Sequence, residues 1–511
     1  MKSSALLSFF FLGLASAAFG GAAPNEVRIQ LAASPGSLDP AIADDDYASK
    51  VLGNTTDCLF GYDAKGKLEN RLAEKITPKA GGLRYEVKLR KGATWSDGAP
   101  ITADQFVAGI RRSLDPKTGS KIASLLFVIK GAKEYYNGQG AAEKVGVSAK
   151  GDVLTFDLVK PTPYFAQLLT LSQAAPVRAD VLAANGGKWP AIAPSTGAYR
   201  IVSYQPEQDL RLEPNQKYWN AKPGALPVVL RIVPDESTAV SLFESGMLDV
   251  VGRIPPYDLK RFRDKGLVQS FPQAATYFLS FNAKKPPFDS AAARRAVSGA
   301  VDRAGTVALL DSAHLPANGW IPPTLEGYVK GDAMAKKLEA DATKNAVGLK
   351  KYSGSISAAY SANAVNGVVM ERLQNDLEKK IGVKIGLSTM DWKAYVTAIR
   401  TDTPAIYRFQ RGAAFMDPIW HLASFTSDDP NNPTGWKNAE YDRLVDRIAR
   451  TPSGSARVKL IAQAEKILVE DEAIVVPVYY PMVSHLVAAR VEGFVMDPLN
   501  GIPFAKIRLK N

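Results

Sequence analysis

Cysteine and histidine are the scarcest chemical groups in this chain of 511 residues, which has one Cys and three His. A single thiol, Cys58, cannot form a disulfide within one chain, and its apolar neighbours predict a buried side chain. His314, His421 and His485 are far apart in the sequence, and no Cys or carboxylate cluster completes a metal-binding set. We therefore predict no metal site and no cofactor.

Catalytic motifs are also missing. The sequence has no G-x-S-x-G nucleophile elbow and no S-x-x-K arrangement. Residues 61–68, GYDAKGKL, fall one residue short of a phosphate-binding loop, because Leu68 stands where Ser or Thr must reach the metal ion. We interpret this segment as a surface turn and the protein as a binding protein, not an enzyme.

Long apolar runs are absent after the N-terminus. Lys2 precedes the apolar run ALLSFFFLGLA and then the small residues SAAFGGAA, which is the order of a secretory signal peptide over residues 1–20. Cleavage after Ala17 and cleavage after Gly20 both fit. The run is shorter than the ~20 residues of a membrane span, and no Cys follows it to carry a lipid anchor. We expect an exported, soluble protein without stable membrane insertion.

Charge is plentiful but scattered. The net charge is +12, with 63 Lys and Arg among 51 Asp and Glu, and no basic run reaches the five to eight residues of a binding patch. This pattern argues against nucleic-acid binding. An acidic run, Asp44 to Asp46, is either a solvated loop or an electronegative wall for a cationic group.

Strands and helices alternate along the chain, which predicts an α/β protein of about two to four domains. The clearest local signal is the capping box of Thr102 and Gln105, which precedes a helical face of Phe106, Val107, Ile110 and Leu114. Other expected strands are 27–31, 84–89, 153–159, 228–233, 276–281 and 474–480; other expected helices include 365–380, 392–400, 441–450 and 455–471.

The stretch 405–420, AIYRFQRGAAFMDPIW, is the strongest candidate for a binding segment. It begins with a short β-type run, carries Arg408 and Arg411 at a spacing of three, and then crosses Gly412, Ala413 and Ala414. Small residues leave the backbone accessible and arginine supplies fixed positive charge, which suits a polar ligand lying against the chain.

Several sequence blocks occur together in one order. They are LRKGATWSDGAPITADQFVAGIRRSLDP, STGAYRIVSY with NQKYWN, PPFDSAAARRAVSGAVDR, PANGWIPP, AIYRFQRGAAFMDP and AIVVPVYY. In these blocks the chain resembles the periplasmic oligopeptide-binding proteins, the family 5 solute receptors of ABC importers.

The resemblance implies a large class II periplasmic-binding-protein fold, in which two lobes close over an extended peptide. It places lobe 1 at residues 21–65, 196–275 and 483–511, an extra domain of that lobe at 66–195, and lobe 2 at 276–482. The strands at 276–281 and 474–480 are expected at or near the two crossings between the lobes, where a closing motion is absorbed.

The resemblance also assigns roles to residues. Arg408 matches an arginine that meets a peptide carboxylate, Trp392 an aromatic that lines a side-chain pocket, and Asn366 a position near the C-terminus of the peptide. Ala414 stands where the family carries the aspartate that meets the peptide amine, and Arg411 where it carries a tryptophan. Asp44 and Asp46 are placed on the segment of lobe 1 that faces the ligand.

The function implied is that of a monomeric periplasmic receptor that captures short peptides and delivers them to an inner-membrane ABC permease. Because Ala414 replaces the usual acid, a second interpretation stays open. In it the ligand is another polar solute, such as an N-blocked peptide, a cell-wall peptide or a metal chelate.

Overall fold

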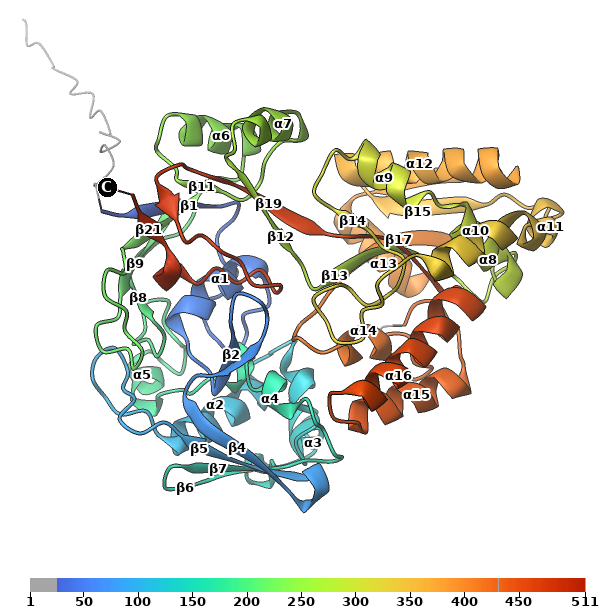
Figure 1. Cartoon of the computed structure of the whole chain (residues 1–511). Helices are drawn as coiled ribbons and strands as arrows, with labels where there is room; N and C mark the ends of the chain where they lie inside the picture. The colour runs from blue at the N-terminus through green and yellow to red at the C-terminus, as the bar shows by residue number, and fades with distance from the viewer. Residues whose placement is uncertain (1–24, 431, 511) are drawn as a thin grey trace, which may run out of the picture.

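The computed structural model describes residues 25–430 and 432–510 of the chain. The predicted signal peptide lies outside the described residues. Two lobes stand side by side in Figure 1 and are joined by strands that run from one to the other. Among the described residues no helix is both long and apolar enough to cross a membrane.

The first lobe is built on a seven-stranded sheet in the order β12-β19-β11-β1-β10-β9-β8. β1 is buried along its whole length between the parallel neighbours β10 and β11, and its polar residues Arg28 and Gln30 are hydrogen-bonded to Asp249 and the Val233 carbonyl. The strands are β1 (Val27–Leu31), β8 (Tyr199–Gln205), β9 (Asp209–Pro214), β10 (Val228–Ile232), β11 (Val250–Val251), β12 (Val268–Pro272) and β19 (Met482–Val487). The helices of this lobe are α1 (Asp46–Thr55), α6 (Glu236–Glu244) and α7 (Pro256–Asp264), and the chain ends in the small pair β20 (Val491–Glu492) and β21 (Arg508–Leu509).

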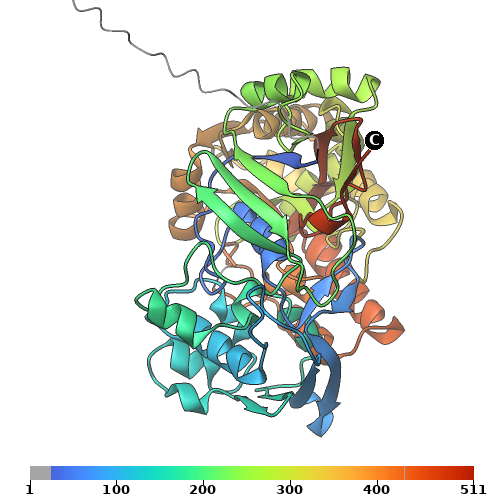
Figure 2. The same cartoon turned by 90° about the vertical axis from the view of Figure 1, so that its left-hand side faces the viewer.

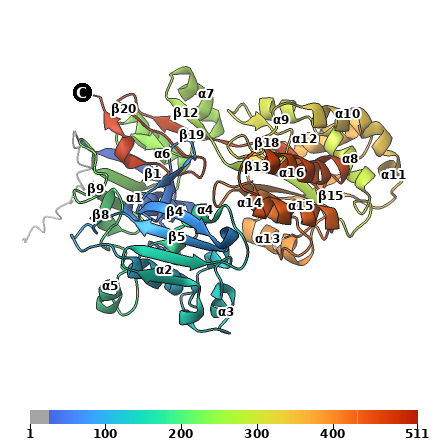
Figure 3. The same ribbon diagram turned by 60° about the horizontal axis from the view of Figure 1, so that its bottom comes forward.

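A separate four-stranded sheet, in the order β4-β5-β7-β6, lies below the seven-stranded sheet in Figure 2 and toward the viewer in Figure 3. The expected capping box of Thr102 and Gln105 is present at the start of α2, and the predicted apolar face of this helix is buried. The elements of this region are β4 (Ala73–Lys79), β5 (Arg84–Leu89), α2 (Ala103–Leu114), α3 (Ala132–Tyr136), β6 (Val147–Lys150), β7 (Val153–Asp157), α4 (Phe165–Leu168) and α5 (Ala179–Ala184). The predicted turn at 61–68 connects the hairpin strands β2 (Phe60–Tyr62) and β3 (Leu68–Asn70).

The second lobe is built on a six-stranded sheet in the order β14-β18-β13-β17-β15-β16. Apolar residues of α8, α10 and α12 share one buried cluster with this sheet, while α13 and α14 to α16 belong to other clusters against it. The strands are β13 (Ala275–Phe281), β14 (Leu315–Pro316), β15 (Ser357–Ser361), β16 (Gly386–Met390), β17 (Ile406–Gly412) and β18 (Val475–Tyr480). The helices are α8 (Ala291–Ala300), α9 (Arg303–Leu309), α10 (Ala333–Asn345), α11 (Val347–Lys350), α12 (Ala364–Ile381), α13 (Trp392–Thr401), α14 (Ile419–Ala423), α15 (Ala439–Arg450) and α16 (Ser455–Glu465).

One of these helices differs from its prediction. The sequence predicts a single helix over residues 455–471, but α16 ends at Glu465 and the next turns, Lys466–Asp471, are π-helical. Such a change in hydrogen bonding is not visible in the apolar period of the sequence.

Two short crossings join the lobes. β12 passes into β13 through residues 273–274, and β18 passes into β19 through Pro481. β12 pairs with β19 in the first sheet, and β13 pairs with β18 in the second, so the two crossings form a continuous antiparallel ribbon. The amide of Gln273 donates to the carbonyl of Pro481 at 3.1 Å. The two strands expected near the crossings are therefore the ones that lead into them.

A second contact between the lobes is made by the loop after β17. The rings of Phe415 and Tyr164 stack with centroids 5.8 Å apart and planes within 5°. The Tyr62 hydroxyl accepts a hydrogen bond from the Met416 amide at 3.1 Å. The loop of the candidate binding segment is thus packed against Tyr62 and Tyr164 of the first lobe.

Candidate functional site

The parallel strands of lobe 2 end at one edge of its sheet. β15 pairs in parallel with both β16 and β17, and α12 and α13 begin directly beyond β15 and β16. In open α/β sheets ligands bind outside the carboxyl ends of parallel strands. A ligand site is therefore expected at this edge.

Arg408 lies at this edge and is buried, with 7% of its surface exposed. Its guanidinium donates through Nη2 to the Ser361 hydroxyl and lies 5.4 Å from the centre of the Tyr277 ring. Among the described residues its Nε has no hydrogen-bond partner, and no carboxylate forms an ion pair with it. A buried, unpaired guanidinium is costly, and an incoming anion relieves that cost.

Asn366 fixes the groups around this arginine from the first turn of α12. Its Nδ2 donates to the Ser361 carbonyl at 2.8 Å, and its Oδ1 accepts from the Tyr277 hydroxyl at 3.1 Å. The structure therefore brings Arg408 and Asn366 together at Ser361, and their role in ligand binding stays a prediction. Tyr277 was missed by the sequence reasoning, although its strand was predicted, because only strand pairing places it beside Arg408.

Trp392 is the first residue of α13 and is 58% exposed. Its ring stacks on that of Phe409, with centroids 6.0 Å apart and planes within 25°. Side chains alternate along a strand, so Phe409 and Arg408 point to opposite faces of β17. Trp392 thus offers an exposed aromatic surface on the face opposite to Arg408.

Arg411 also points away from Arg408, because a spacing of three residues places two side chains on opposite faces of a strand. Its guanidinium lies 4.4 Å from the centre of the Trp420 ring, and Nη2 donates to the Trp420 carbonyl at 3.1 Å. Burial lowers the pKa of Arg411 to about 10. The neighbouring His421 is fully buried, and burial, with a smaller effect of Arg411, lowers its pKa to about 3. The two arginines therefore do not form one cationic cluster.

Ala414 is half-buried in the loop whose Phe415 stacks on Tyr164. The acid closest to it in the sequence is Asp417, three residues further on, which is held by Arg457 through contacts of 2.6 and 2.8 Å. Burial raises the pKa of Asp417 despite this partner. Asp417 already has a cation, so it does not replace the missing aspartate at position 414.

The three acids of the run Asp44 to Asp46 have different surroundings. The Asp44 carboxylate accepts a hydrogen bond from Lys121 Nζ at 2.8 Å. Asp45 caps α1 through the amides of Tyr47 and Ala48, and Asp46 is exposed in the first turn of that helix. Of the two acids predicted to face a ligand, only Asp46 has no ion pair among the described residues.

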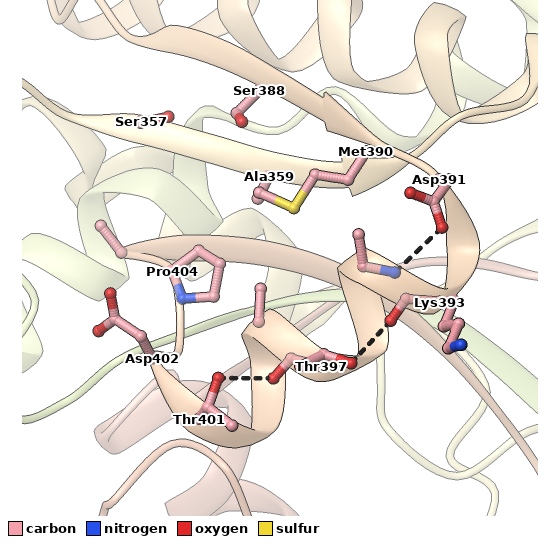
Figure 4. Close-up of a pocket in the computed structure, with 13 residues that line it drawn as sticks. Ser357, Ala359, Ser388, Met390, Asp391, Lys393, Thr397, Thr401, Asp402 and Pro404 are labelled. Atoms are coloured by element: carbon pink, nitrogen blue, oxygen red, sulfur yellow. Dashed lines mark hydrogen bonds between the residues drawn. The ribbon is translucent and has the colours of Figure 1, made fainter.

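A separate cavity of about 740 Å³ lies between α13 and the strands β15 and β16 (Figure 4). Most of its polar side chains are already bonded: Asp391 caps α13, and the hydroxyls of Thr397 and Thr401 donate to helix carbonyls. No predicted site residue lines it; its lining consists of Ser357, Ala359, Ser388, Met390, Asp391, Lys393, Ala394, Thr397, Ala398, Thr401, Asp402, Pro404 and Ala405. Within the described part of the chain, no group of three or more His, Cys, Asp or Glu is placed to hold a metal ion.

Comparison with known proteins places this geometry in a family. The model of the bacterial extracellular solute-binding proteins, family 5, matches residues 67–433. The oligopeptide-binding protein OppA of Bacillus subtilis is 27% identical over 99% of this chain and 98% of its own length. A probable deoxycholate-binding periplasmic protein of Escherichia coli, YgiS, is 28% identical over 92% of this chain and 91% of its own length.

The fold agrees with this assignment. The crystal structure of Haemophilus influenzae OppA in complex with the peptide RPPGFSPFR has a TM-score of 0.76 and 25% identity, and the match covers 95% of this chain and 99% of that one. The two lobes described above are those of the periplasmic-binding-protein fold. The chain belongs to the bacterial extracellular solute-binding proteins of family 5.

Proposed function

We propose that this protein is the periplasmic receptor of an ABC importer, that it captures short peptides between its two lobes, and that it passes them to an inner-membrane permease without chemical change. The names of its relatives support peptide as the ligand class. The ribbon of two crossings supports closure of one lobe toward the other. In this proposal the receptor acts as a monomer.

The observation that carries the proposal is the buried guanidinium of Arg408, which has no carboxylate partner among the described residues. A peptide carboxylate fits this position because arginine binds carboxylates through two parallel N–H groups. Hydrogen bonds of Asn366 to Ser361 and Tyr277 order the side chains around the guanidinium before the ligand binds. Asp46 supplies a negative charge on lobe 1, and Trp392 supplies an exposed apolar surface for a ligand side chain on the face of β17 opposite to Arg408.

Calorimetry with pools of di- to pentapeptides tests the proposal directly. Each pool is measured with a free C-terminus and as the C-terminal amide. We expect binding of the free acids and much weaker binding of the amides. Absence of heat with every pool would exclude peptides as the ligand.

A second candidate is a ligand that has the acid but no amine. It is favoured by Ala414, because the acid closest to it in the sequence is already occupied by Arg457. An unpaired ammonium would be expensive to bury beside this loop. Deoxycholate, named for the relative YgiS, is a steroid acid without an amine and is a suitable probe.

N-acetylation separates the two candidates. If the amine is bound by a carboxylate, acetylation of a peptide should weaken binding strongly. If affinity is the same for the free and the acetylated peptide, no amine anchor operates and the second candidate is preferred.

A further inference from the structure

Three flat rings form a continuous stack at the crossing between the lobes. Tyr277 of β13 and Tyr479 of β18 stand opposite each other, with ring centroids 4.5 Å apart and planes within 15°. The His314 ring lies on Tyr479 at 4.6 Å, with planes within 2°. The stack therefore ties together both crossing strands and the residue that precedes β14.

The two ends of this stack have different neighbours. At one end the Arg408 guanidinium lies 5.4 Å from the centre of the Tyr277 ring. At the other end His314 Nδ1 accepts a hydrogen bond from the Met482 amide at 3.1 Å. Met482 follows Pro481, at the point where the chain leaves lobe 2.

His314 must be neutral to accept this hydrogen bond, since a protonated imidazole has no free lone pair. Burial lowers its pKa to about 4, so the ring is neutral at ordinary pH. The structure also fixes the tautomer: Nδ1 is the acceptor, and the proton is on Nε2.

The bond between His314 and Met482 joins parts that belong to different lobes. His314 is held in lobe 2 by stacking on Tyr479. Met482 is the first residue of β19, which pairs with β12 and β11 in the sheet of lobe 1. A rotation of lobe 1 relative to lobe 2 changes the angle between the Met482 N–H and the ring, and a hydrogen bond weakens steeply when its angle falls below about 120°.

We propose that His314 is a positioning residue that opposes lobe closure, because its bond to Met482 stabilises the arrangement of the crossing in this structure. The inference rests on the proposed function in so far as that function uses lobe closure. The bond between His314 and Met482 lies at the end of the stack that is far from Arg408. The rings of Tyr277 and Tyr479 therefore connect the proposed carboxylate site with the crossing.

Two substitutions separate the hydrogen bond from the stack. His314→Phe keeps a flat ring on Tyr479 but removes the acceptor. His314→Asn removes the ring but presents a side-chain oxygen close to the position of Nδ1. Because a single hydrogen bond contributes about 0.5–1.5 kcal/mol, the phenylalanine variant should increase the closed-to-open ratio of the ligand-free protein about 2- to 10-fold. The asparagine variant should leave the ratio near that of the parent protein.

The closed-to-open ratio is measured as a distribution of distances between two spin labels. Lys222 in lobe 1 and Lys351 in lobe 2 are exposed and suit replacement by cysteine, and the native Cys58 is buried and does not compete for the label. Hydrogen exchange at the Met482 amide gives an independent readout and should accelerate only in the phenylalanine variant.

The outcomes decide the proposal. A shift toward short distances with His314→Phe, but not with His314→Asn, supports it. No shift with His314→Phe overturns it, and an equal shift with both variants overturns it in favour of the stack itself. If His314→Phe does not fold, Met482→Pro removes the donor from the other side and is judged in the same way. All measurements use ligand-free protein, so a failure to bind peptides would defeat the proposed function without deciding this one.

Discussion

Two arginines of lobe 2 are equally hidden from solvent but surrounded very differently. Arg457 is 3% exposed and bonds to the carboxylates of Asp417 and Glu326 at 2.6 and 2.7 Å. Arg408 is 7% exposed and donates to the hydroxyl of Ser361, with no ion pair among the described residues. A buried charge with partners holds a structure together, whereas a buried charge without one is a place for a ligand.

The strongest test of this comparison removes the paired arginine. Arg457→Met leaves the buried Asp417 without a cation, so the free energy of unfolding should fall by about 3–5 kcal/mol. Urea denaturation measures the loss. The matched control is Arg450→Met, whose pair with Asp446 is exposed and should contribute less than about 0.5 kcal/mol. Equal losses for the two variants would contradict a structural role for Arg457.

Glu465 extends the comparison to a buried acid. Its carboxylate accepts from the amides of Trp320 and Ile321, no ion pair to it occurs in the described residues, and burial raises its pKa to about 7. The folded pKa exceeds the unfolded one, so the folded state binds more protons between about pH 4.5 and 7, and stability falls as the pH rises through this window.

The substitution Glu465→Gln isolates this effect, because it mimics the protonated acid at every pH. The parent protein should lose about 3 kcal/mol relative to the variant between about pH 4.5 and 7, and nothing further above pH 7. Thermal denaturation of both proteins over this range provides the measurement. A difference that does not change with pH would show that Glu465 has an ordinary pKa.

Removal of the unpaired arginine should affect binding more than stability. Arg408→Ala deletes the proposed carboxylate partner, so peptides with a free C-terminus should lose about 2 kcal/mol or more of binding free energy, and amidated peptides much less. Calorimetry with both forms provides the comparison. An equal loss for the two forms would show that Arg408 does not bind the C-terminal carboxylate of the peptide.

The smallest effect on binding is expected from removing a hydrogen bond beside Arg408. Tyr277→Phe keeps the stack with Tyr479 but removes the hydrogen bond to Asn366, so affinity for acid-ended peptides should fall by about 1 kcal/mol. Tyr479→Phe is the control, because it preserves the stacking ring and leaves the bond from Tyr277 to Asn366 in place. A larger loss with the control would place the important contact at Tyr479.

Local signals predicted the elements well. The alternation of Arg84–Leu89 and the capping box at Thr102 each act within a few residues, and each occurs where the sequence indicates. The helix predicted to end at Asp471 does continue to that residue, but its hydrogen bonds change from α to π after Glu465, a change that the sequence pattern does not indicate. At the point of change, the Glu465 carboxylate accepts from the amides of Trp320 and Ile321, which belong to a loop distant in the sequence.

Of the residues predicted to bind a ligand, the structure gathers only some in one place. Arg408 and Asn366 were named from the sequence and do meet around Ser361. The position of Arg411 on the other face of β17 follows from strand geometry, but its contact with Trp420 becomes visible only when the loop folds back.

The sequence by itself determined the order of strands and helices, the scarcity of metal-binding and thiol groups, and the family. Only the tertiary structure decided which buried arginine forms an ion pair with a carboxylate. Arg457 meets an acid 40 residues away, and Arg408 meets a hydroxyl 47 residues away. The pairing of a buried charge depends on which distant segments share an edge of a sheet, and local propensity carries no information about that choice.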